Sequence, residues 1–108
     1  MKEFKGLFPP VITPFDADGN FAEQAFRDHI DFLIANDVDG MCIATSTGEF
    51  MNLTESERDR VMQVGIEHIA GRVPAICGGA ALSTPAAVKL SQHGEKMGYK
   101  GLLIISPW

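Results

Sequence analysis

Three consecutive hydroxyl side chains stand where a predicted strand ends: Thr45, Ser46 and Thr47. Residues 41–44 before them are an apolar run behind a glycine, which is typical of a short strand. Gly48 follows the hydroxyls, and a glycine allows a tight turn and a close approach of another group. Hydroxyl and backbone N–H groups at such a turn can bind a small anion. On this stretch alone, a polar turn that caps a strand is an equally good interpretation.

The other candidates for chemistry are weaker. Loop 16–20, DADGN, resembles a calcium loop, but its glycine comes too early for an EF-hand and the distal glutamate is missing. Ordinary turn chemistry explains the loop better. The histidines His29, His68 and His93 fall on three separate predicted helices and form no ligand set. No GxGxxG motif follows a strand, so the fingerprint of a dinucleotide-binding site is absent. Together, these observations predict neither a metal nor a cofactor.

Composition limits the class of protein. The 108 residues are 45% hydrophobic and 21% charged, which is typical of one soluble globular domain. The net charge is −5 and the basic residues are scattered, which argues against nucleic acid or an anionic membrane as a partner. No apolar run approaches a membrane span, and no secretory apolar region follows the N-terminus. Cys42 and Cys77 have no metal-type spacing, so we expect buried thiols in a cytoplasmic protein.

Strands and helices alternate in the predicted secondary structure. Four apolar runs predict strands, and the paired prolines in the first of them suit a first or edge strand. The predicted strands are 6–13, 41–44, 73–77 and 101–106.

Three amphipathic stretches between these strands predict helices. The first spans 22–36. The second begins with a capping box, Thr54 with Glu57, and ends at Gly71. The third spans 83–98, with Ser83 as its N-cap and a proline at its first helical position.

The order βαβαβαβ, with strands beginning about 30 residues apart, predicts an α/β fold with a parallel sheet and right-handed crossovers. A small doubly wound sheet and the first half of a (β/α)8 TIM barrel both fit. In either fold the functional groups lie at the carboxyl ends of the strands. Thr13, the turn at 46–49, the glycines at 78–79 and residues 107–108 would gather there, which favours the anion site over a plain turn.

Several motifs resemble the dihydrodipicolinate synthase / N-acetylneuraminate lyase family. The resemblance covers the whole chain, with its spacing intact. It rests on the run GLFPPVITPF at 6–15; on STGE at 46–49 followed by LT at 53–54 and ER at 57–58; on VP at 73–74 with GG at 78–79; and on SPW at 106–108.

The resemblance implies a (β/α)8 barrel enzyme, commonly a homotetramer. Such enzymes form a Schiff base between a lysine and pyruvate or a related 2-keto acid, and act as lyases or aldolases without a cofactor. Residues 1–108 would be the N-terminal half of the barrel, with strands one to four, helices one to three and no separate second domain. A tetramer or dimer, and a small 2-keto acid as substrate, are the partners that this resemblance implies.

The resemblance also assigns roles to residues. Ser46 and Thr47 match the hydroxyl pair that grips the keto-acid carboxylate, and Ser46 also matches the hydroxyl of a proton relay. Gly48 belongs to the same substrate-binding turn, which Glu49 supports. Trp108 stands where the family usually has tyrosine. Thr45 also departs from the family, which usually has glycine before the hydroxyl pair.

A Schiff-base lysine must project from a strand into the barrel. None of the chain's lysines is predicted there: Lys2, Lys5, Lys89, Lys96 and Lys100 precede strands or lie on a helix. The segment alone is therefore expected to be inactive, with its lysine and partner tyrosines on later strands. The alternative is a stand-alone, non-catalytic half-barrel that serves as a binding or assembly module for small carboxylates. The coding sequence after Trp108 would discriminate between the two hypotheses.

Overall fold

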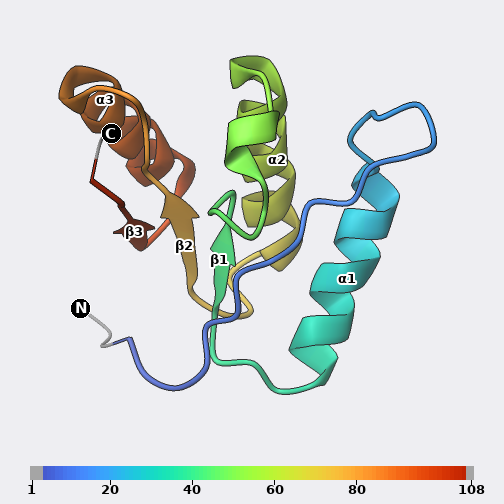
Figure 1. Ribbon diagram of the computed structural model, residues 1–108. Helices are drawn as coiled ribbons and strands as arrows, with labels where there is room; N and C mark the ends of the chain where they lie inside the picture. Colours follow the sequence, from blue (N-terminus) through green and yellow to red (C-terminus); the bar gives the residue numbers. More distant parts are fainter. Residues whose placement is uncertain (1–3, 107–108) are drawn as a thin grey trace.

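Three parallel strands alternate with three long helices in the computed structural model, which describes residues 4–106 (Figure 1). A short 3₁₀ helix, η1, follows the first strand. The elements in chain order are α1 Glu23–Ala35, β1 Met41–Ile43, η1 Phe50–Asn52, α2 Glu55–Ile69, β2 Ala75–Gly78, α3 Thr84–Met97 and β3 Gly101–Leu103.

The sheet has the order β1-β2-β3, and both pairings are parallel. Ile43 pairs with Cys77 across β1 and β2, and Gly78 pairs with Leu103 across β2 and β3. The carboxyl ends of the three strands therefore lie at one edge of the sheet. The chain returns from the end of β1 through α2 and from the end of β2 through α3, as the predicted βαβ units require.

The first predicted strand, at 6–13, is wrong as a regular strand. The segment forms a single isolated bridge, Pro10 with Cys42, beside β1. Val11 N–H donates to the Cys42 carbonyl (2.9 Å), and Cys42 N–H donates to the Pro9 carbonyl (3.0 Å). Two adjacent prolines have no N–H to donate, so the ladder cannot continue. The segment nevertheless runs alongside β1, in the place of a first strand (Figure 1).

The helix signals are confirmed with small changes. The Thr54 hydroxyl accepts from Glu57 N–H (3.1 Å), and the Glu57 carboxylate accepts from Thr54 N–H (2.8 Å), which completes the predicted capping box. Ser83 caps α3 by accepting from Ala86 N–H. Because α3 begins at Thr84, its proline stands at the second helical position and not at the predicted first one.

The core lies between the strands and the helices. Its fully buried side chains come from α1, β1, α2, β2 and segment 6–13, and include Val11, Phe26, Ile43, Met62 and Cys77. Cys42 and Cys77 are buried and free, as predicted. The segment Leu102–Ile105 differs sharply, because each of its side chains is 40–55% exposed. β3 ends at Leu103 and not at 106 as predicted, and no further strand pairs with it among residues 4–106.

The loop at 16–20 is held by turn chemistry. The Asp16 carboxylate accepts from the N–H groups of Asp18 and Asn20, and Gly19 adopts a φ of +82°. Within the described part of the chain, no three potential metal-binding side chains come together. No helix of the described residues is long and apolar enough to cross a membrane.

Candidate functional site

The hydroxyl residues lie on a tight turn at the carboxyl end of β1. The chain leaves the sheet after Ile43 through Ala44, which adopts a φ of +56°. Glu49 N–H then donates to the Ser46 carbonyl (2.9 Å), and Phe50 N–H donates to the Thr45 carbonyl (3.4 Å). A positive φ is uncommon for a residue with a side chain. Its occurrence here shows that the surrounding contacts determine the course of the turn.

Ser46 and Thr47 both have exposed side chains at this turn. Neither hydroxyl has a hydrogen-bond partner among residues 4–106, apart from solvent. The pair can therefore donate to a ligand without first breaking a bond within the described fold.

Gly48, which follows the two hydroxyl residues in the turn, is buried. The Thr13 hydroxyl, which is also buried, donates to the Gly48 carbonyl at 2.7 Å. A Cβ on Gly48 would lie 3.0 Å from the Val11 carbonyl oxygen, so the close approach of segment 6–13 favours glycine here. The N-terminal segment thus supports the turn through a hydrogen bond and close packing. The predicted proximity of Thr13 to residues 46–49 is confirmed.

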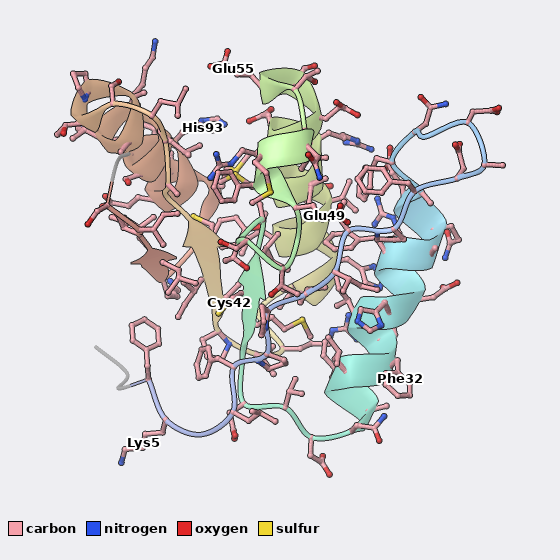
Figure 2. The ribbon with its side chains drawn as sticks, viewed as in Figure 1. Lys5, Phe32, Cys42, Glu49, Glu55 and His93 are labelled. Carbon is pink, nitrogen blue, oxygen red and sulfur yellow. The ribbon has the colours of Figure 1, made fainter. Side chains whose placement is uncertain are left out.

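Glu49 and Trp108 are the two residues predicted to support the site. Glu49 is exposed, has a φ of +60° and accepts from the Asn52 amide (3.1 Å). Figure 2 shows it beyond the end of β1, at the same end of the molecule as Glu55. Trp108 lies outside the described residues.

The end of β2 lies against this turn. A Cβ on Gly78 would come within 2.1 Å of the Ala44 carbonyl oxygen, so the two backbones touch where a side chain could not fit. Gly79 N–H donates to the Leu103 carbonyl of β3 at 3.0 Å. The predicted convergence of the strand ends is thus confirmed for β1, β2 and the segment that contains Thr13.

Arg58 is a residue whose role the sequence did not reveal. Its Nη1 donates to the Ala80 carbonyl and its Nη2 to the Gly78 carbonyl, both at 2.9 Å. The guanidinium carbon lies 4.6 Å from the centre of the Phe50 ring. Burial lowers the pKa of Arg58 from its ordinary value. The Glu57-Arg58 pair within the family motif was the available signal, but the sequence could not show what the arginine contacts.

Lysines that could form a Schiff base are absent from this edge of the described fold. Lys5, Lys89, Lys96 and Lys100 are exposed, and none lies at the carboxyl end of a strand. Figure 2 shows Lys5 at the opposite end from Glu49, and Lys2 lies outside the described residues. Burial raises the pKa of the Cys77 thiol to about 11, which keeps it protonated near neutral pH.

The chain's single tyrosine makes its hydrogen bond within the core, away from the hydroxyl turn. Tyr99 is buried, and its hydroxyl donates to the Met62 carbonyl of α2 at 2.6 Å. Burial raises its pKa above the ordinary value. Tyr99 is therefore a structural residue.

Parallel βα units with a supported hydroxyl turn at the carboxyl ends of their strands fit part of a (β/α)8 barrel. Residues 3–108 match the model of the dihydrodipicolinate synthetase family, and the chain belongs to this family.

Named relatives agree with this assignment. The chain is 39% identical over 104 residues to 4-hydroxy-tetrahydrodipicolinate synthase of Brucella abortus, which covers 96% of the chain and 36% of the relative. It is 36% identical to the crystal structure of YagE, a prophage protein of the family from E. coli K12 in complex with pyruvate, with a TM-score of 0.92 and 97% and 35% of the two chains covered. For N-acetylneuraminate lyase from Mycoplasma synoviae the identity is 34%, the TM-score 0.90, and the coverage 97% and 36%.

The chain thus spans about a third of the length of these relatives. The superpositions confirm the predicted fold class, a parallel α/β arrangement that forms the first part of a (β/α)8 barrel. They favour the barrel over the small doubly wound sheet.

Proposed function

We propose that residues 1–108 are the N-terminal portion of a class I lyase or aldolase that forms a Schiff base with pyruvate or a related 2-keto acid. The observation that carries the proposal is the pair of exposed hydroxyls, Ser46 and Thr47, without partners in the described fold and held on a buttressed turn at the strand ends. The likeness to a protein crystallised with pyruvate supports a keto acid as the ligand.

In this proposal the hydroxyl pair binds the carboxylate of the keto acid. Thr47 and Ser46 each donate a hydrogen bond to one carboxylate oxygen, and charge-assisted bonds of this kind are stronger than neutral ones. Ser46 also passes a proton during the reaction. Gly48 and Glu49 hold the turn in shape, and Trp108 borders the site. No cofactor takes part.

The Schiff-base lysine comes from outside residues 1–108, on a later strand of the barrel. The relay tyrosines come from outside this segment too, since Tyr99 is buried against α2. The segment alone is accordingly inactive and forms no separate second domain. The complete protein is a cytoplasmic homo-oligomer, a tetramer or a dimer.

Two single substitutions in the complete protein test the proposal. Thr47→Val removes a donor to a charged group, so KM for the keto acid should rise about tenfold to a hundredfold, which corresponds to about 1.5–3 kcal/mol. Ser46→Ala should lower kcat more than it raises KM, because a proton relay acts chiefly in the transition state.

Steady-state kinetics with pyruvate measure both effects. Ser56→Ala is the matched control, since Ser56 is an exposed hydroxyl residue in the first turn of α2 and outside the hydroxyl turn. Wild-type kcat and KM in both turn variants would show that the turn has no part in catalysis.

A further inference from the structure

At the carboxyl ends of β1 and β2, the pairing of the two strands stops before β2 ends. β1 leaves the sheet after Ile43, so the last residue of β2, Gly78, has no partner on that strand. Its carbonyl bonds to the Arg58 guanidinium of α2 in place of a strand N–H. Gly79 N–H, in the same peptide unit, bonds to β3. Both polar groups of this peptide therefore have hydrogen-bond partners. Arg58 supplies the partner on the side where pairing with β1 has ended.

Arg58 reaches a second carbonyl two residues further along, that of Ala80, with its other terminal nitrogen. The two bonds fix the segment between the end of β2 and the start of α3. A guanidinium suits this task because its donors are fixed in one planar fork. An ammonium group on a flexible stem cannot reproduce that geometry.

The same guanidinium also contacts the residue that follows the hydroxyl turn. Its central carbon lies over the ring of Phe50, which is buried and begins η1 directly after the turn. Phe50 N–H in turn donates to the Thr45 carbonyl, immediately before the hydroxyl pair. One side chain thus connects the loop after β1 to the loop after β2.

Arg58 has no carboxylate partner among residues 4–106, unlike other arginines of α2 and its C-terminal loop. Arg60 pairs with Glu23, and Arg72 pairs with Asp31. The position of Arg58 is therefore set by the two carbonyls and the ring. Its half-buried charge adds a positive potential at the edge where the proposed site lies, which favours an anionic ligand.

We propose that Arg58 is a positioning residue that holds the hydroxyl turn and the Gly78–Ala80 loop at a fixed separation for binding of the keto-acid carboxylate. The proposal rests on the proposed function for its kinetic consequence. Its structural content, the coupling of the two loops through one guanidinium, is independent of the reaction.

The test uses the complete protein with Arg58→Ala and Arg58→Lys. Because the carboxylate site loses its alignment, kcat/KM for pyruvate should fall on the order of a hundredfold in both variants, with a rise in KM. Added methylguanidinium should restore about tenfold of the loss in Arg58→Ala, whereas methylammonium should restore none, because only the former has the planar fork. A merely stabilising role would not give this selective rescue.

Arg60→Ala is the matched control, because Arg60 lies on the same helix and pairs with an exposed glutamate. We expect its kcat/KM to stay within about twofold of wild type, as exposed ion pairs contribute little. If Arg58→Ala fails to fold, Arg58→Lys carries the test, with the same loss of kcat/KM, on the order of a hundredfold, in a protein whose melting temperature is unchanged. Wild-type kinetics in Arg58→Lys would overturn the proposal.

Amide hydrogen exchange separates this proposal from the proposed function. The N–H groups of Phe50 and Gly79 are hydrogen-bonded on the two loops, so both should exchange faster in Arg58→Lys while those of the helix cores do not change. If wild-type protein does not react with pyruvate but these amides respond, the proposed function fails and the positioning role stands. If the amides exchange as in wild type, the positioning role is overturned whatever the activity.

Discussion

Two buried threonines at the same end of the sheet provide a sharp test of how the turn is held. Thr13 is 3% exposed and its hydroxyl donates to the Gly48 carbonyl at 2.7 Å. Thr45 is 4% exposed, and its hydroxyl has no hydrogen-bond partner among residues 4–106. Valine has nearly the same shape as threonine, so Thr13→Val and Thr45→Val each remove little more than a hydroxyl.

The two substitutions should have opposite effects on the free energy of unfolding. Thr13→Val leaves the buried Gly48 carbonyl without its partner, and an unsatisfied buried acceptor costs about 1–3 kcal/mol. Thr45→Val removes a hydroxyl that is buried without a partner, so it should be neutral or stabilise the fold by up to about 1–2 kcal/mol. The expected difference between the variants is therefore about 1–5 kcal/mol, with Thr13→Val the less stable.

Equilibrium urea unfolding of the complete protein measures this difference, with amide exchange at Glu49 and Phe50 as the local readout. Exchange at these two amides should accelerate in Thr13→Val and stay unchanged in Thr45→Val. The reasoning is refuted if Thr13→Val unfolds within about 0.5 kcal/mol of wild type, or if Thr45→Val is the more destabilised of the two.

Two further predictions concern the stability of the chain. The isolated fragment 1–108 should not sediment as a monomer, because Leu102–Ile105 presents an exposed apolar strand end with no partner among the described residues. A monodisperse monomer that melts cooperatively at tens of micromolar would contradict this prediction. In the capping box, the N–H of Thr54 lowers the pKa of Glu57 below its ordinary value of 4.5, so its contribution is present above that pH and is lost as the pH falls through the lowered pKa. The melting temperature of wild type should therefore exceed that of Glu57→Gln at pH 7 and lose this lead in acid, and a gap that does not depend on pH would count against the capping role.

The sequence predicted those parts of the fold that depend on local signals. The capping box at Thr54 and the alternation of strands with helices follow from short-range patterns, and the structure confirms them. Segment 6–13 was the exception. Its apolar residues suggested a strand, but Pro9 and Pro10 interrupt the ladder, and only the contact with β1 shows that the segment still occupies a strand's place.

The candidate site was predictable in its residue types and not in its supports. The hydroxyls of Ser46 and Thr47 next to Gly48 indicated an anion site, because their chemistry can be read from the sequence. The support from Thr13 joins residues 35 positions apart, and the bonds from Arg58 span 20 and 22 positions. Contacts at such separations follow from the packing of the whole fold, which no local pattern encodes.

In the proposed function, this chain supplies the carboxylate-binding turn of a Schiff-base enzyme whose lysine lies outside residues 1–108. Borohydride trapping with pyruvate, followed by peptide mass spectrometry, tests it most directly on the complete protein and on fragment 1–108 in parallel. We expect a stoichiometric adduct on one lysine of the complete protein, outside residues 1–108, and no adduct on the fragment. An adduct on any lysine within residues 1–108, or none on the complete protein, would contradict it.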